Sequence, residues 1–214
     1  MNNLYFFAMK YCWVLIFLMA LGCNDSPEPQ KTSPARPKIL TDTNTAQARN
    51  PYVDVDVSPM DMSYMPADYP KLLVKNSLPV ARVIYSRPHK QGRVIFGNLI
   101  KYGEPWRLGA NEATELEVFQ TVTIKGKNIS KGKYILYALP QKDHWTIIFN
   151  TNLNSWGLNL DSTKDVHRFD IPVLRKQQSV EYFSMVFQNN DSGADLVIAW
   201  DDIEARLPIQ FKEK

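Results

Sequence analysis

The feature that most constrains this chain is an alternation of apolar and polar residues that begins after the first third of the sequence. Between residues 115 and 124, the apolar side chains Leu116, Val118, Val122 and Ile124 fall on one face, and charged or hydroxyl side chains fall on the other. A period of two residues indicates a β-strand with one buried face, because successive side chains of a strand point to opposite sides. The alternation therefore predicts a half-buried strand here.

Further segments carry the same pattern or a denser apolar run typical of an interior strand. They are residues 80–86, 134–139, 145–150, 167–173, 181–187, 196–200 and 207–211. The last two predict a hairpin with its turn at residues 201–204, and Pro208 predicts an edge position for the returning strand, because proline lacks a ladder donor. About eight short strands without an amphipathic helix predict an all-β fold, an antiparallel β-sandwich of the jelly-roll or immunoglobulin-like kind. A small β-barrel is the alternative.

Composition limits what can hold such a fold together. The chain has 214 residues, of which 44% are hydrophobic, and its two cysteines, Cys12 and Cys23, both lie in the leader region. The strand region can therefore form no disulfide and no thiolate metal site, so packing must supply its stability. A formal net charge of +3 does not provide the concentrated basic surface that a nucleic-acid-binding protein needs. We expect no nucleic-acid partner.

The N-terminal residues resemble an export signal. An apolar run of about a dozen residues follows Lys10 and is too short to span a bilayer, which takes roughly 20. The run ends in Leu21-Gly22-Cys23, which resembles the lipobox of bacterial lipoproteins, where the cysteine is acylated and becomes the new N-terminus. We expect a signal peptide at residues 1–22, acylation and membrane anchoring at Cys23, and a location in the cell envelope, at the outer membrane or the periplasmic face. An uncleaved membrane anchor is the alternative.

The sequence after the leader predicts a flexible, disordered tether at residues 23–56 and one β-sandwich domain at residues 57–214. Eight of the 14 prolines and no glycine lie between residues 24 and 70, and proline favours an extended, solvated chain. Met60, Met62 and Met65 stand close together near the end of this stretch. We expect them to pack against the domain as apolar gap-fillers, with a thioether site for Cu(I) as the alternative.

Two segments are longer than most connections in such a fold, and each combines a tryptophan with glycine, asparagine and a carboxylate. They are residues 96–114 and 150–165. Aromatic faces beside amides and carboxylates suit a sugar or another small polar ligand, although the same residues also build ordered structural loops. We therefore predict a binding face for a small polar ligand, a glycan or an envelope protein. The candidate residues are Arg87, Trp106, Arg107, Asn111, Glu112, Asn150 and Trp156.

Motifs in the same region resemble those of a known family. They are Tyr85-Ser86-Arg87-Pro88, residues 92–97, residues 102–114, Gly132-Lys133-Tyr134, residues 145–150 and Trp156-Gly157. This pattern is similar to the domain of unknown function 2911 family, which comprises uncharacterised exported proteins and lipoproteins, mainly of Bacteroidetes, and it covers about residues 60–211. The resemblance implies a compact, β-rich exported domain. It supplies no catalytic residue.

Sequence templates for catalysis are not met. The three histidines form no metal-binding pair, and neither a nucleophile elbow nor a phosphate-binding loop is present. We predict no catalytic residue, no metal and no cofactor, and favour a binding module over an enzyme. The alternative is a glycan-active hydrolase in which Glu112 works with Glu104 or Glu115, since glycoside hydrolysis uses two carboxylates. A structural role for Glu112 would be an ion pair with Arg87 or Arg107, and a structural envelope lipoprotein without a small ligand is the third interpretation.

Overall fold

The computed structural model describes residues 58–69, 78–153 and 155–211. The chain divides into two compact units, residues 1–48 and 49–214, and every described residue belongs to the second. The predicted signal peptide at residues 1–22, the acylation site Cys23 and the predicted tether at residues 23–56 lie outside the described residues. Within the described ranges, no helix is long and apolar enough to cross a membrane.

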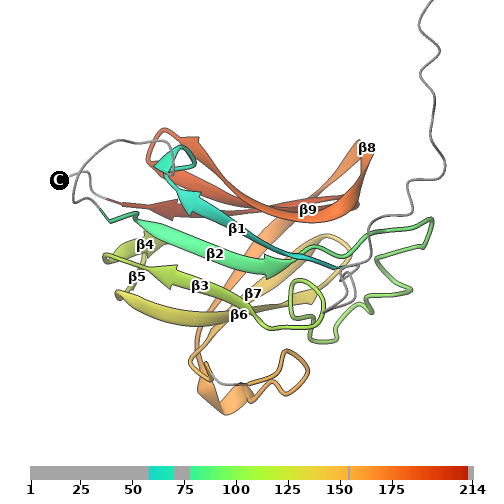
Figure 1. Cartoon of the computed structure of the whole chain (residues 1–214), viewed down its shortest axis with the longest axis horizontal. Coiled ribbons are helices and arrows are strands. Elements are labelled where there is room, and N and C mark those ends of the chain that lie inside the picture. Colours follow the sequence, from blue (N-terminus) through green and yellow to red (C-terminus); the bar gives the residue numbers. More distant parts are fainter. Residues whose placement is uncertain (1–57, 70–77, 154, 212–214) are drawn as a thin grey trace, which may run out of the picture. The chain divides into compact units, whose positions relative to one another are not determined.

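The described residues form nine strands that pair antiparallel throughout, with a short 3-10 helix, η2 (Ser162–Lys164), before the longest strand (Figure 1). The strands are β1 (Met60–Met65), β2 (Ala81–Ser86), β3 (Thr114–Val118), β4 (Val122–Ile124), β5 (Lys127–Ile129), β6 (Gly132–Pro140), β7 (His144–Asn150), β8 (Asp165–Asn190) and β9 (Gly193–Gln210). This confirms the all-β antiparallel class that the alternation predicted.

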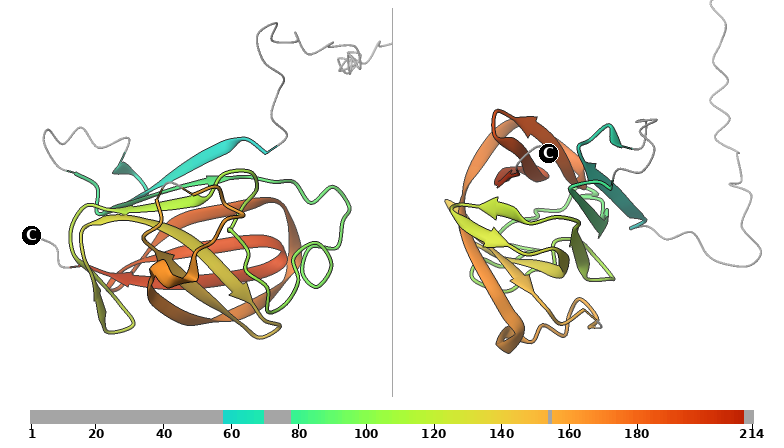
Figure 2. Two further views of the ribbon diagram at one scale, coloured as in Figure 1. Left: turned by 90° about the horizontal axis from the view of Figure 1, so that it is seen from below. Right: turned by 90° about the vertical axis from the view of Figure 1, so that its left-hand side faces the viewer.

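The strands form one sheet in the order β1-β2-β3-β6-β7-β8-β9-β4-β5. The first part of β8, from Asp165 to Pro172, pairs with β7, and the part from Val173 to Asn190 pairs with β9. The sheet curves around its core, so that the β8–β9 hairpin lies across from β1 and β2 (Figure 2). There the backbone N–H of Phe187 in β8 donates to Ser63 Oγ in β1 at 3.2 Å. The finer choice between a sandwich and a barrel stays a prediction.

The predicted hairpin at residues 201–204 is wrong, because β9 continues through these residues as a single strand. Trp200 before these residues, Ile203 within them and Ala205 after them are all buried, so the strand keeps contact with the core throughout. Asp201 adopts a positive φ of 54° between two shifts in the β8–β9 register, which marks a bulge rather than a reversal. The polar doublet therefore bends the strand, and the true turn of the hairpin lies between Asn190 and Gly193.

The edge position predicted for Pro208 is also wrong, since β9 has β8 on one side and β4 on the other. Pro208 lies between Ala205, the last residue of β9 paired to β8, and Gln210, which pairs with Thr123 of β4. Proline has no backbone N–H, and Pro208 lies at a position where neither β8 nor β4 pairs with β9. Residues 115–124, predicted as one strand, form β3 and β4 with a break between them, but all four apolar side chains of the predicted face are buried.

The methionine-rich stretch forms β1 and pairs along its whole length with β2. Met65 is fully buried, whereas Met60 and Met62 are about half exposed. Met60 Sδ accepts a hydrogen bond from Ser86 Oγ at 3.0 Å. The prediction that this stretch packs against the domain is confirmed, with Met65 as the residue that enters the core.

Candidate functional site

The two long segments meet. They are the β2–β3 segment (residues 87–113) and the β7–β8 segment (residues 151–164). Gly157 of the second is buried against the first: a Cβ atom at Gly157 would lie 2.7 Å from Arg107 Cδ and 3.1 Å from the Ala113 backbone nitrogen. Only a residue without a side chain permits this approach. Segments about 50 residues apart in the sequence therefore form one continuous surface.

A cavity of about 650 Å³ opens between the two segments, a volume within the range of small-molecule sites. The β2–β3 segment supplies most of its wall, the β7–β8 segment supplies a second side, and Trp200 of β9 completes it. The lining residues are Ser58, Pro88, His89, Gln91, Arg93, Leu99, Ile100, Pro105, Trp106, Arg107, Gly109, Ala110, Gly157, Leu158, Leu160 and Trp200. Apolar and aromatic side chains predominate, and the charged side chains of this lining are arginines.

Trp106 joins the cavity to the core. Its backbone N–H and C=O are both paired with Ala138 of β6, each at 2.8 Å, so the segment is held to the sheet at this residue. The indole packs edge-on against Trp145 with ring centroids 5.5 Å apart, and it stacks near Trp200 at 6.3 Å. Trp106 is consequently only 8% exposed. This candidate residue is a core residue with one edge on the cavity.

Arg107 lies half-buried beside the junction with Gly157. Its Nη1 atom is buried and has no hydrogen-bond partner among the described residues. Burial lowers the pKa of Arg107, and no neighbouring carboxylate opposes that effect. The guanidinium nevertheless remains protonated at neutral pH. A buried cationic donor without a partner is costly in a folded protein, and such exceptions call for an explanation.

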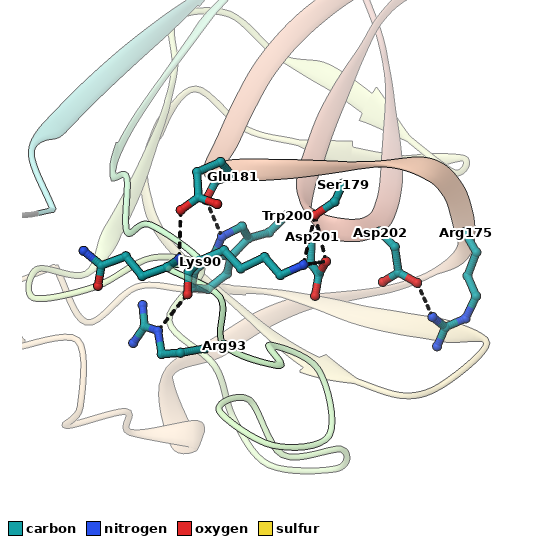
Figure 3. Close-up of polar contacts among 9 residues, drawn as sticks. Lys90, Arg93, Arg175, Ser179, Glu181, Trp200, Asp201 and Asp202 are labelled. Carbon is teal, nitrogen blue, oxygen red and sulfur yellow. Dashed lines mark hydrogen bonds and ion pairs between the residues drawn. The ribbon is translucent and has the colours of Figure 1, made fainter.

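Residues 88–93 form one wall of the cavity, and hydrogen bonds to the bend of the β8–β9 hairpin hold this wall in place (Figure 3). The backbone N–H of Lys90 donates to the Glu181 carbonyl at 2.8 Å, and Trp200 Nε1 donates to the same carbonyl at 3.2 Å. Arg93 Nε in turn donates to the Lys90 carbonyl at 2.9 Å. These bonds hold residues 90–93 against the bend, so this wall of the cavity is built by long-range contacts.

Lys90 also forms a polar cluster with Ser179 and Asp201. Its Nζ lies 2.5 Å from Asp201 Oδ1 and 3.1 Å from Ser179 Oγ, and Ser179 donates to the same carboxylate at 3.0 Å. Burial favours the neutral carboxyl, but the hydrogen bonds from Lys90 and Ser179 outweigh it and lower the pKa of Asp201. The Lys90 ammonium and the Ser179 hydroxyl are therefore both engaged with the Asp201 carboxylate.

Two other candidate residues have structural partners. Arg87 forms an ion pair with Asp61 at 3.2 Å, and its guanidinium lies 5.5 Å from the centroid of the Tyr182 ring. Asn150 is 1% exposed. Its Nδ2 donates to the Asp161 carbonyl and to Asp165 Oδ1, both at 2.8 Å, while its Oδ1 accepts from the Asn152 N–H at 2.8 Å. Both amide hydrogens of Asn150 are therefore used to hold the β7–β8 segment.

Asn111, Glu112 and Trp156 lie at the surface of the junction. Asn111 is exposed and has a positive φ of 56°, a conformation that asparagine tolerates in turns. Glu112 is exposed and makes no ion pair with the described residues, so the expected pairing with Arg87 or Arg107 is not found. Trp156 is 48% exposed. Of the seven candidates, Trp106 and Arg107 line the large cavity, and the others do not.

A smaller cavity of about 390 Å³ lies on the other side of this junction. Its lining includes Glu112, Glu115 and the exposed Trp156, together with apolar residues of β1, β2 and β6. Glu104, the other carboxylate considered in the sequence, is not part of this lining. No cluster of three or more potential metal-ligating side chains occurs in the described ranges.

Sequence reasoning missed His89, Arg93, Leu158 and Trp200, all of which line the large cavity. Trp200 alternates with Ile198 in a strand, and this pattern predicted a core position, where the structure places it. Arg93 stands in one of the motifs used for the family resemblance, which was the available signal. The sequence gives no indication that the bend at Asp201 would place Trp200 beside the two long segments.

The sequence matches the family described as protein of unknown function (DUF2911) over residues 71–209. The chain belongs to this family. The DUF2911 region takes in β2 to β8 and nearly all of β9, and it contains both long segments. Every lining residue of the large cavity except Ser58 falls within it. No curated protein and no solved structure matches the chain.

Proposed function

We propose that this DUF2911 protein is an extracytoplasmic, lipid-anchored binding module that holds a small ligand in the large cavity. The observation that carries the binding function is the cavity of about 650 Å³ where the two long segments meet. A concave site with an aromatic and apolar lining and a few polar groups is the usual form of a small-molecule site. The polar surroundings of Lys90 are satisfied internally, which favours binding over catalysis at this position.

Fluorine NMR with 4-fluorophenyl compounds tests ligand binding on the full-length chain in neutral detergent. Ala110 lines the cavity, so Ala110→Trp should fill it and abolish the line broadening of the bound probes. Thr121→Trp adds the same side chain at an exposed position outside the lining and should preserve binding. Thermal unfolding of both variants checks that they fold. Equal binding by Ala110→Trp and the unmodified chain would place the ligand elsewhere and reject the proposal.

The anchor is supported by the sequence Leu21-Gly22-Cys23 after a short apolar run. Two or more acyl chains at one terminus give stable membrane attachment, whereas a single chain does not. Labelling growing cells with radioactive palmitate should mark the chain, and Cys23→Ser should remove the label. Cys12→Ser, at the chain's other cysteine, is the matched control and should retain it. Label that persists in Cys23→Ser would reject acylation at this residue.

A second candidate function is hydrolysis of a glycan at the smaller cavity, favoured by the presence of Glu112, Glu115 and Trp156 in one lining. Two carboxylates and a flat aromatic ring are the elements of a glycosidase site. A panel of glycans incubated with the purified chain should then show turnover that Glu112→Gln abolishes. Glu104→Gln, an exposed carboxylate outside that cavity, should not affect it. Absence of turnover, or turnover insensitive to Glu112→Gln, rejects the hydrolase.

A further inference from the structure

We propose that the large cavity selects an anion attached to an apolar group, such as a carboxylate or phosphate on an aromatic ring; this rests on the binding function proposed above. Among the described residues, the lining contains Arg93, Arg107 and His89 but no aspartate or glutamate. A concave site of one charge sign with low-dielectric walls concentrates ligands of the opposite sign. The composition of the lining therefore favours a negative ligand over a neutral or positive one.

Arg107 is the residue expected to bind the anion. Its Nη1 is buried and has no partner among the described residues, so the folded protein carries an unsatisfied, charged donor beside the cavity. A guanidinium binds carboxylate or phosphate through two parallel hydrogen bonds, and such charge-assisted bonds are stronger than neutral ones. A ligand anion would give Nη1 the partner that the described residues do not provide.

Arg93 supplies a second cation whose orientation is already fixed. Its Nε donates to the Lys90 carbonyl at 2.9 Å, and its Nη2 donates to the His89 carbonyl. These partners are neutral, so they leave the positive charge uncompensated. Two carboxylates near this wall have partners of their own: Asp201 pairs with Lys90, and Glu181 Oε1 accepts from the Gln91 N–H at 2.8 Å.

The apolar part of the ligand has a surface of its own. Leu99 is 49% exposed and Leu158 is 72% exposed, and both line the cavity. Leu160 and one edge of Trp106 complete this apolar part of the lining. A small inorganic anion would leave this surface uncovered, whereas an aromatic or alkyl anion buries it. The two features together define an amphipathic anion as the ligand class.

Four probes that differ in charge but share one ring test this inference on the full-length chain. They are 4-fluorophenyl phosphate, 4-fluorobenzoate, 4-fluorobenzyl alcohol and 4-fluorobenzyl-trimethylammonium, each followed by fluorine NMR titration. We expect the anions to bind about tenfold or more tightly than the alcohol, and the ammonium not to bind. A preference between the phosphate and the benzoate separates the two possible sources of the anion, and either preference supports the inference.

Substitutions test whether Arg107 determines the preference for anions. Arg107→Gln should lower anion affinity about tenfold or more while leaving the alcohol unchanged, and Arg107→Lys should fall between the two because it keeps the charge but loses the planar fork. Lys131→Gln removes an exposed positive charge outside the cavity lining and should change neither affinity. If Arg107→Gln fails to fold, Arg107→Lys and Arg93→Gln carry the test. A loss of selectivity is a readout that a purely structural role of Arg107 would not produce.

The possible failures are distinguishable. If the alcohol binds as tightly as the anions and Ala110→Trp abolishes both, the cavity binds ligands but the anion inference is wrong. If anion binding survives Arg107→Gln, Arg107→Lys and Arg93→Gln unchanged, the inference is likewise wrong. If no probe binds, or if Ala110→Trp leaves binding intact, the proposed binding function fails and the inference fails with it.

Discussion

The two long segments are built from similar residues and reach opposite environments. Each carries a tryptophan and at least one glycine, asparagine and carboxylate. In the β2–β3 segment Trp106 is 8% exposed and lies within the ring cluster of the core. In the β7–β8 segment Trp156 is 48% exposed and its neighbour Leu158 is 72% exposed. Residue type alone does not decide whether a loop tryptophan serves the core or the surface.

Backbone pairing accounts for the difference. Trp106 exchanges two hydrogen bonds with Ala138 of β6. One residue of the β2–β3 segment thus pairs with the sheet, and its indole points into the core. The β7–β8 segment is held at its two ends instead, by Asn150 and by the 3-10 helix capped by Asp161. Between these ends Gly157 packs against Arg107 and Ala113, and the neighbouring Trp156 and Leu158 line the smaller and the large cavity, respectively.

The largest expected effect is that of Trp106→Ala. Truncating a buried tryptophan costs about 3–5 kcal/mol in the free energy of unfolding, because the transfer energy is lost and a void remains. Urea denaturation followed by circular dichroism measures the change, with Trp156→Ala as the matched control. If the two variants are equally stable, the assignment of one tryptophan to the core and the other to the surface is wrong.

The next effect is that of Asn150→Ala, which removes the end restraint of the β7–β8 segment. Three hydrogen bonds are lost, and the Asp161 carbonyl and Asp165 Oδ1 each lose a donor. We expect a loss of about 1–3 kcal/mol in the free energy of unfolding. Hydrogen exchange should show faster exchange at residues 151–164 and little change at residues 87–113.

Asn159→Ala is the control for this variant, since no hydrogen bond of the Asn159 side chain is found among the described residues. Its free energy of unfolding should stay within about 0.5 kcal/mol of the unmodified chain. Faster exchange spread evenly over both segments in Asn150→Ala would contradict the view that Asn150 mainly restrains the β7–β8 segment.

The fold could be predicted from the sequence where the determinant is local, and not where it is distant. Leu116 and Val118, or Trp145 and Ile147, alternate within a few residues, and their strands were predicted from that pattern alone. Asp201 and Asp202 look like a turn in sequence, but their partners are Lys90 and Arg175, which lie far along the chain. A strand whose polar residues are paired by distant cations cannot be recognised from its own composition.

The candidate site shows the same limit. The sequence singled out the two long segments, because their length and tryptophan content are local properties. It could not separate Asn150, whose amide is used inside the segment, from Arg107, whose Nη1 has no partner in the described part of the chain. That distinction depends on which groups the folded chain brings together, as at Gly157 and Arg107. Side-chain chemistry identifies candidates, and only packing shows which of them are free to bind.

A smaller, pH-dependent effect is expected from Tyr137, whose hydroxyl donates to Asp165 at 2.7 Å beside Asn150. Burial, and then the hydrogen bond to Asp165, raise the pKa of Tyr137 above its usual value of 10.0. The folded chain keeps this proton at pH values where the unfolded chain loses it. The contribution is therefore complete below about pH 10 and declines as the pH rises further.

Tyr137→Phe should cost about 1.5 kcal/mol at neutral pH, and its free energy of unfolding should fall less steeply above pH 10 than that of the unmodified chain. Urea unfolding at pH 7, 9 and 11 measures both quantities. Parallel pH profiles for the two proteins would show that Tyr137 does not hold its proton more tightly in the folded state.

Trp156→Ala is expected to have the smallest effect on stability. It also tests the comparison between the β2–β3 and β7–β8 segments most directly. Because the indole is 48% exposed, its removal should change the free energy of unfolding by no more than about 0.5 kcal/mol. Trp156 lines the smaller cavity and not the large one, so binding of the fluorophenyl anions should also be unchanged. A variant that keeps stability but loses anion binding would move the site across the junction to the smaller cavity. In that event Trp156, rather than Arg107, would be the residue through which this domain meets its ligand.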